Sequence, residues 1–129
     1  SYAEYSAVSE KVACLKPQNI THEEAASIPL AAQTALQALR DKGQIKPGHR
    51  VLINGASGGV GIFAVQIAKA QGTQVTAVCS EKNAELVKNL GADRIIDYNK
   101  QNFTKEDIKY DIILDAVANR SYWECQNIL

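Results

Sequence analysis

The feature that most constrains this chain is a glycine-rich turn, Asn-Gly-Ala-Ser-Gly-Gly-Val-Gly, at residues 54–61. An apolar run at 51–53 precedes the turn, and residues with helical spacing follow it at 62–68. A strand, a glycine turn and a helix in this order can hold a dinucleotide pyrophosphate, because the helix N-terminus attracts the phosphate charge. Such a turn can also be purely structural, but a second apolar strand at 74–78 lies where a βαβ unit requires it. The turn therefore predicts a dinucleotide-binding site.

Small residues occupy the three positions of the dinucleotide fingerprint in this turn, namely Ala56, Gly58 and Gly61. Alanine stands where the first glycine is usual. Gly58 is expected to let the backbone approach a phosphate, and Gly61 to let the helix pack closely on the preceding strand.

The end of the second strand indicates which dinucleotide is bound. An NAD-preferring site places Asp or Glu there, on the ribose hydroxyls, whereas this chain has Cys79 followed by Ser80. With no carboxylate to repel a 2′-phosphate, with a hydroxyl donor and with Lys82 close by, these residues favour NADPH. Two alternatives stay open: Glu81 becomes the ribose acid if the strand ends two residues later, and Ser80 is only a helix N-cap.

Size and charge exclude several classes of protein. The chain has 129 residues with 46% hydrophobic content, enough for one domain, or part of one, with a real core. Its 14 basic and 14 acidic residues cancel and form no runs, so there is no electrostatic footprint for nucleic acid or an anionic membrane. No stretch approaches the roughly 20 apolar residues of a membrane-spanning helix, and the first residues do not resemble a signal peptide. We expect a soluble, cytoplasmic protein with no nucleic-acid or membrane partner.

The cysteines and histidines predict no metal site. Cys14, Cys79 and Cys125 are odd in number, far apart and outside any CxxC pair, which argues against disulfides and a zinc knuckle. His22, in the first turn of a predicted helix, and His49, in a Lys-Pro-Gly-His turn, are both expected to be solvated. No residue of the chain is predicted to be catalytic.

Helix signals dominate the first third of the chain. Thr21 and Glu24 match a capping box, which predicts a helix start. We expect Pro29 to interrupt that helix, giving a short helix followed by a longer one over 30–39. Residues 2–8 alternate loosely and could form a strand.

From residue 51 onwards, strands and helices alternate. Strands are predicted at 51–54, 75–79, 94–97 and 110–117, and helices at 61–71, at 81–90 and from Ser121. Gly72 and Gly91 are expected as left-handed helix C-caps, and residues 100–109 as a loop with one helical turn. This alternation predicts an α/β fold with a parallel sheet and crossover helices. Four strands are fewer than the six of a complete dinucleotide domain and no Met begins the chain, so we expect part of a longer polypeptide.

Five further motifs accompany the glycine turn in a fixed order. They are Ile-Pro-Leu-Ala-Ala-Gln-Thr-Ala at 28–35, Lys-Pro-Gly at 46–48, Leu-Gly-Ala-Asp at 90–93, Ile-Asp-Tyr at 96–98 and Asp-Ile-Ile-Leu-Asp at 111–115. Over nearly the whole chain, this set closely resembles the zinc-independent quinone oxidoreductases of the medium-chain dehydrogenase/reductase superfamily. The resemblance implies that residues 1–28 are the C-terminal remnant of a GroES-like catalytic domain. It implies that residues 29–129 are an incomplete NADP-binding domain of Rossmann type, with a doubly wound parallel sheet.

The same resemblance implies an activity. Members of this family transfer hydride from NADPH to a quinone or to the activated C=C of an enone or alkenal, and they are commonly homodimers. The chain would be the cofactor-binding portion of such an enzyme and inactive by itself. Two alternatives stay open: an enoyl reductase module of a polyketide or fatty acid synthase, and a non-catalytic NADPH-binding protein of the same fold.

Site residues follow from the resemblance by position. The pyrophosphate would be wrapped by Ser57, Gly58, Gly59, Val60 and Gly61, and the 2′-phosphate surrounded by Ser80, Lys82 and Asn83. Tyr98 would complete the 2′-phosphate pocket, Thr34 would lie near the nicotinamide half and Val117 on the adenosine side. Structural alternatives remain for these last three: a half-exposed aromatic at a strand end, a helix residue facing the sheet and a core valine.

Two positions depart from patterns in the superfamily. Leu30 stands four residues before Thr34, where the zinc-dependent alcohol dehydrogenases have a zinc-binding cysteine. Leucine cannot ligate zinc, so the resemblance favours direct hydride transfer without a metal. The usual Gly-Gly opening of the loop after the fourth strand is replaced here by Ala118-Asn119.

Overall fold

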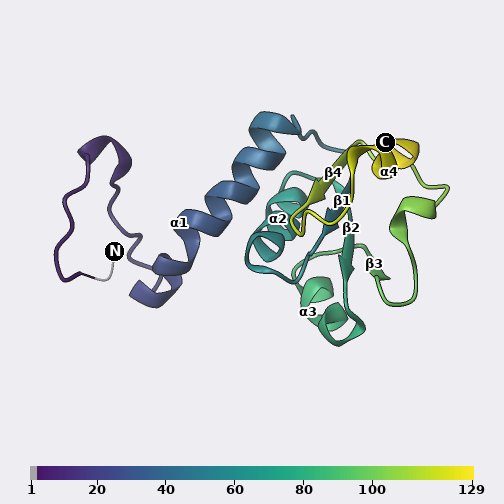
Figure 1. Ribbon diagram of the computed structural model, residues 1–129. Helices are drawn as coiled ribbons and strands as arrows, with labels where there is room; N and C mark the ends of the chain where they lie inside the picture. Colours follow the sequence, from purple (N-terminus) through teal and green to yellow (C-terminus); the bar gives the residue numbers. More distant parts are fainter. Residues whose placement is uncertain (1–2) are drawn as a thin grey trace.

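The computed structural model describes residues 3–129, which form a four-stranded parallel sheet with helices around it (Figure 1). The strands are β1 (Arg50–Asn54), β2 (Gln74–Cys79), β3 (Arg94–Asp97) and β4 (Ile112–Asp115). Their order in the sheet is β3-β2-β1-β4, and every neighbouring pair is parallel. This order matches part of the doubly wound dinucleotide-binding sheet, so the predicted α/β fold is confirmed.

Helices connect and flank the strands. The α-helices are α1 (His22–Gln37), α2 (Gly59–Ala70), α3 (Ala84–Asn89) and α4 (Tyr122–Cys125). A π-helical turn (Ala38–Lys42) extends α1, and 3₁₀ turns lie at Glu10–Val12, Glu81–Asn83, Phe103–Lys105 and Gln126–Ile128. The predicted helix over 81–90 is therefore a 3₁₀ turn followed by α3, and α2 begins two residues earlier than predicted.

Helix α1 begins as predicted but does not break. Thr21 Oγ1 accepts the N–H of Glu24 at 3.1 Å, while the Glu24 carboxylate accepts the N–H of Thr21 at 2.7 Å, so the capping box is confirmed. The predicted interruption at Pro29 is wrong, because the helix continues through it to Gln37. Proline removes one backbone hydrogen bond of the helix. Packing of α1 against α2, and of Ala35 in the core, keeps the rest of the helix intact.

The segment before α1 lies apart from the sheet (Figure 1). Tyr2 lies outside the described residues, and the strand predicted from it is not formed over residues 3–8. Tyr5 and Val8 are exposed, and no neighbouring strand in the described part of the chain offers this segment a hydrogen-bonding partner. Helix α1 runs without a break across the predicted domain boundary at 28/29, and that division stays a prediction.

Side chains that alternate along the strands pack into two separate hydrophobic cores, one on each face of the sheet. Val51 and Ile53 of β1 point to the face covered by α1, α2 and α3, where they pack with Val65 and Val87. On the opposite face, the described core groups Leu52, Val78, Ile96, Phe103, Tyr110, Cys125 and Ile128. Side chains of the connecting segments therefore cover both faces of the sheet. The glycine turn lies at the carboxyl edge, where the strands end.

Candidate functional site

The glycine turn folds against the carboxyl end of the sheet. Its backbone reverses at Gly55, which has a φ of +78°, a conformation that favours glycine. The N–H groups of Gly55 and Ala56 both donate to the Val78 carbonyl at 3.1 Å, so the turn is tied to the end of β2. Ala56 itself is wholly buried in the core. Alanine fits at this fingerprint position because the left-handed residue is the preceding glycine.

Gly61 makes the close helix–strand approach that the sequence predicts. A Cβ on Gly61 would lie 2.1 Å from the Gly55 carbonyl oxygen and 2.7 Å from the Ala56 Cα. Both neighbours are backbone atoms that cannot move aside. A side chain at Gly61 would therefore push α2 away from β1, whereas a Cβ on Gly59 would meet nothing within 4 Å.

The first turn of α2 presents unpaired donors. Gly58 is the N-cap, with its N–H donating to the Gly55 carbonyl at 2.9 Å. The next three N–H groups, those of Gly59, Val60 and Gly61, have no acceptor within the helix. No acidic residue lies in this first turn. These donors and the positive end of the helix dipole form an anion-binding terminus.

A cavity of about 600 Å³ opens over this terminus. The glycine turn forms one wall, and the other walls come from α1 and from the residues that follow β4. Its lining residues are Leu30, Ala31, Gly55, Ser57, Gly58, Gly59, Val60, Gly61, Ala116 and Val117. The cavity therefore brings the predicted pyrophosphate residues together, and it adds Leu30, Ala31 and Ala116.

Ser80, Lys82 and Asn83, three of the four predicted 2′-phosphate residues, lie together at the end of β2, beside the glycine turn. The fourth, Tyr98, follows β3 and lines a different cavity. Asn83 donates from Nδ2 to Ser57 Oγ at 3.0 Å and to Ser80 Oγ at 3.4 Å. Ser80 stands at the N-cap position, yet its side chain makes no capping hydrogen bond. The alternative that Ser80 serves only as a cap is therefore not supported. Lys82 is exposed next to this cluster.

Glu81 does not take the position of a ribose acid. Strand β2 ends at Cys79, two residues earlier than that alternative requires. The Glu81 carboxylate instead forms an ion pair with Lys100 at 2.7 Å.

A second cavity, of about 290 Å³, continues from the first. The two cavities share Gly55 and Val117, so they form one path along the carboxyl edge of the sheet. Its remaining lining residues are Asn54, Tyr98, Phe103, Asn119 and Arg120. Tyr98 and Val117 are 57% and 51% exposed, so the alternative that Val117 is a core valine is wrong.

The loop after β4 is shaped by a partly buried polar contact. The Nδ2 amide of Asn54 donates to Asp115 Oδ1 at 2.8 Å and to Asn119 Oδ1 at 2.9 Å. The Asp115 carboxylate also accepts the backbone N–H groups of Val117, Ala118 and Arg120 at 3.0–3.2 Å. These bonds hold Ala118 at a φ of +58°. The loop thus keeps a left-handed residue although alanine replaces the family's usual glycine.

Thr34 is the predicted residue that the structure does not bring to the others. It is exposed on α1, and its hydroxyl donates to the Leu30 carbonyl at 2.7 Å. The alternative that it faces the sheet is likewise not observed. Leu30 and Ala31, one turn earlier, line the cavity instead.

Sequence reasoning missed several residues that line the two cavities. Asn54 and Gly55 had a local signal, because Asn-Gly directly after a strand is typical of a tight turn. Asn119 was noted only as a departure from the family's Gly-Gly loop opening. Phe103 and Arg120 had no signal, because their loops reach the cavity only through the crossovers of the sheet.

The cysteines and histidines lie outside this site. Cys79 and Cys125 are buried and Cys14 is exposed. Burial, and then the charge of Asp97, raises the pKa of the Cys79 thiol. His49 is half-buried with an unpaired, shielded Nδ1, so the prediction that it is solvated is wrong. Its carbonyl accepts the N–H of Gln74 at 2.8 Å, which holds the residue against the sheet.

Over residues 3–129, no group of three or more His, Cys, Asp and Glu side chains is placed to hold a metal ion. None of the helices described in this range has the length and apolar character needed to span a bilayer.

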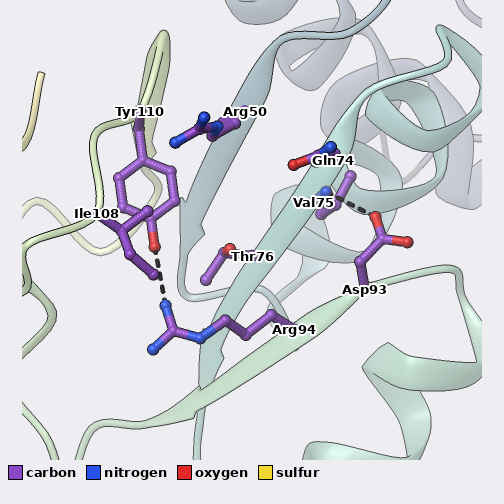
Figure 2. A pocket seen from close by; sticks show the side chains of 8 residues that line it. All are labelled: Arg50, Gln74, Val75, Thr76, Asp93, Arg94, Ile108 and Tyr110. Carbon is purple, nitrogen blue, oxygen red and sulfur yellow. Dashed lines mark hydrogen bonds between the residues drawn. The ribbon is translucent and has the colours of Figure 1, made fainter.

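A separate cavity of about 440 Å³ lies at the opposite, amino edge of the sheet (Figure 2). Arg94 reaches the Tyr110 hydroxyl there at 3.2 Å and also binds the Glu106 carboxylate, at 2.7 Å from one guanidinium nitrogen. The hydrogen bond from Arg94 lowers the pKa of Glu106. Because its guanidinium is already paired, Arg94 braces the loop before β4 rather than offering a free anion site.

Comparison with known proteins places this geometry in a family. Residues 59–129 match the family model described as zinc-binding dehydrogenase. The chain is 44% identical over 120 residues, 92% of its length, to 2-methylene-furan-3-one reductase from Solanum lycopersicum. It is 42% identical, again over 92% of its length, to the chloroplastic NADPH-dependent alkenal/one oxidoreductase of Arabidopsis thaliana. In each case the chain spans 31% of the relative, about a third of its length.

Solved structures give the same result. The quinone oxidoreductase from Coxiella burnetii is 38% identical and superposes with a TM-score of 0.76, over 81% of this chain and 33% of that one. The CurK enoyl reductase is 33% identical with a TM-score of 0.80, over 90% of this chain and 37% of that one. The glycine turn, the strand order and these matches agree. The chain therefore belongs to the zinc-binding dehydrogenase family, in the quinone oxidoreductase branch of the medium-chain dehydrogenase/reductase superfamily.

Proposed function

We propose that this chain is the cofactor-binding portion of an NADPH-dependent reductase that transfers hydride to a quinone or to an activated C=C. One observation carries the proposal. The donor-rich start of α2 and the Ser80, Lys82 and Asn83 cluster lie side by side, joined by the hydrogen bond from Asn83 to Ser57. Two adjacent anion-binding groups suit the two phosphate positions of NADPH.

The residues of the chain would divide the cofactor between them. The N–H groups of Gly59, Val60 and Gly61 would bind the pyrophosphate. Ser80, Lys82, Asn83 and Tyr98 would surround the 2′-phosphate, and Val117, between the two cavities, would contact the adenosine side. The cofactor-binding residues predicted from the sequence also include Thr34, Ala56, Ser57 and Gly58.

When bound, NADPH supplies the hydride, and the role of this chain is to hold and orient it. Leu30 and Ala31 line the cavity beside the glycine turn with apolar side chains, which would help to exclude water from that end. Leu30 cannot ligate zinc, which supports a reductase that works without the metal. No catalytic residue is proposed on this chain.

The names of the relatives support the acceptor class, since one is an alkenal/one oxidoreductase and another a furanone reductase. The homodimer and the cytoplasmic location stay predictions. The Arabidopsis thaliana relative is named as chloroplastic, so the location requires its own test.

Calorimetric titration of NADPH and NADH into the complete protein that carries this chain tests the proposal. We expect NADPH to bind about tenfold more tightly than NADH, a difference of about 1.4 kcal/mol, and Ser80→Asp to reverse the order. NADPH oxidation should then be followed with quinones and enones as acceptors. Binding of neither nucleotide would refute the proposal.

A second candidate function is supported by the similarity to the CurK enoyl reductase. An enoyl reductase module would reduce the C=C of an acyl thioester. Comparing turnover of an enoyl thioester with that of the free enone separates the two candidates, since only the module is expected to prefer the thioester. Nucleotide affinity without turnover on any of these acceptors would instead favour a non-catalytic NADPH-binding protein.

A further inference from the structure

A solvent-exposed ion pair borders the predicted 2′-phosphate cluster. Glu81, directly after Ser80, lies 2.7 Å from the Nζ of Lys100. The two residues are 19 positions apart and come from the segments that follow β2 and β3. They meet because these strands are parallel neighbours, with Cys79 opposite Asp97 at their carboxyl ends.

Glu81 is the carboxylate that would oppose the proposed cofactor preference. A carboxylate this close to the cluster repels a 2′-phosphate, which NADPH carries and NADH lacks. Lys100 reduces this repulsion, because its ammonium balances the charge of Glu81 and its hydrogen bond draws the carboxylate towards the segment after β3.

The charges around the Glu81–Lys100 pair are consistent with Lys100 neutralising Glu81. Lys82 makes no ion pair with any residue in the range 3–129, so its charge is left for a ligand. The hydrogen bond and charge of Glu81, and then the charge of Asp97, raise the pKa of Lys100. Lys100 therefore stays protonated throughout the neutral range. Without Lys100, the charge of Glu81 beside the cluster would have no partner.

We propose that Lys100 is a specificity-determining residue that favours NADPH over NADH by holding and neutralising Glu81 beside the 2′-phosphate cluster. This inference rests on the proposed function, since it concerns the same nucleotide site. Lys100 is a positioning residue, because it acts through Glu81 and not by contact with the cofactor.

A double-mutant cycle in the complete protein tests the inference, with Kd for NADPH and for NADH measured by calorimetry. We expect Lys100→Met to raise the Kd for NADPH about three- to fivefold and to leave the Kd for NADH unchanged. Glu81→Gln should leave NADPH binding as tight as in the wild type or tighter. In the Glu81→Gln background, Lys100→Met should have no effect, because the charge that Lys100 neutralises is gone.

Lys105→Met is the matched control, since Lys105 is an exposed lysine of the same connecting segment. It should leave both Kd values unchanged. The inference is overturned if Lys100→Met does not change the ratio of the two Kd values, or if it weakens NADPH binding equally with and without Glu81. The second result would mean that Lys100 contacts the phosphate itself. Failure of the proposed function gives a different result from failure of this inference, because the wild-type protein would then bind neither nucleotide or would prefer NADH.

Discussion

The side-chain amide of Asn83 donates to the hydroxyl of Ser57 across 3.0 Å, and this contact joins the helical turn after β2 to the glycine turn after β1. The two residues are 26 positions apart. Because Asn83 also reaches Ser80, one side chain links the two halves of the proposed phosphate site. The position of each half therefore depends on the other.

Replacing Asn83 with Ala should weaken nucleotide binding more than it weakens the fold. A hydrogen bond of this kind contributes about 1 kcal/mol, so we expect the Kd for NADPH to rise about fivefold. Calorimetry measures that change, and thermal unfolding checks the fold. Asn89→Ala is the control, since Asn89 is exposed at the end of α3. Equal Kd values for wild type and Asn83→Ala would show that the contact does not organise the site.

The two glycines at the start of α2 should respond very differently to the same substitution. Gly61→Ala places a methyl group 2.1 Å from the Gly55 carbonyl oxygen, so we expect a loss of about 3 kcal/mol in the free energy of unfolding. Gly59→Ala has open space and should be neutral or stabilise by about 0.5 kcal/mol. Urea unfolding compares the two variants. Similar stabilities would contradict the close approach of α2 to β1.

The Arg94–Glu106 pair should make part of the stability dependent on pH. The Glu106 side chain is only 5% exposed, and the hydrogen bond from Arg94 lowers its pKa below the ordinary value of 4.5. A depressed carboxyl pKa stabilises the folded state above the unfolded pKa, and this contribution is lost as the pH falls through the folded pKa. Glu106→Gln should therefore cost about 2 kcal/mol at neutral pH and progressively less in acid.

Urea unfolding of wild type and Glu106→Gln, from neutral pH into acid, measures the difference in the free energy of unfolding. Glu85→Gln, at an exposed position of α3, serves as the control and should show no such trend. A difference that stays constant with pH would mean that Glu106 acts through packing and not through its charge.

The three cysteines should differ in reactivity towards a thiol-specific dye. Cys14 is exposed and should react at once in the folded protein. Cys79 and Cys125 are buried, and burial raises the pKa of both thiols, so few thiolates are present and access is blocked. Mass spectrometry should find one label before denaturation and three after it. Rapid labelling of Cys79 in the folded state would contradict the packing at the end of β2.

Local and periodic features of the sequence were sufficient for the sheet and the glycine turn. The Thr21–Glu24 cap, the apolar strands and the small residue at Gly61 each depend on neighbours within a few positions, and each is confirmed. Gly72 and Gly91 have the predicted left-handed conformation, with φ of +74° and +108°. The 3₁₀ turn at Phe103–Lys105 likewise confirms the helical turn expected within the loop 100–109.

Tertiary structure decided the parts that depend on distant neighbours. Packing on α2 carries α1 through Pro29, and the turn of α1 that reaches the cavity presents Leu30 while Thr34 bonds to its own helix. The pairs Asn54–Asp115 and Glu81–Lys100 join residues 61 and 19 positions apart. A sequence pattern specifies which residues share a strand end, but only the crossovers of the folded sheet bring those ends together and select the side chains that meet there.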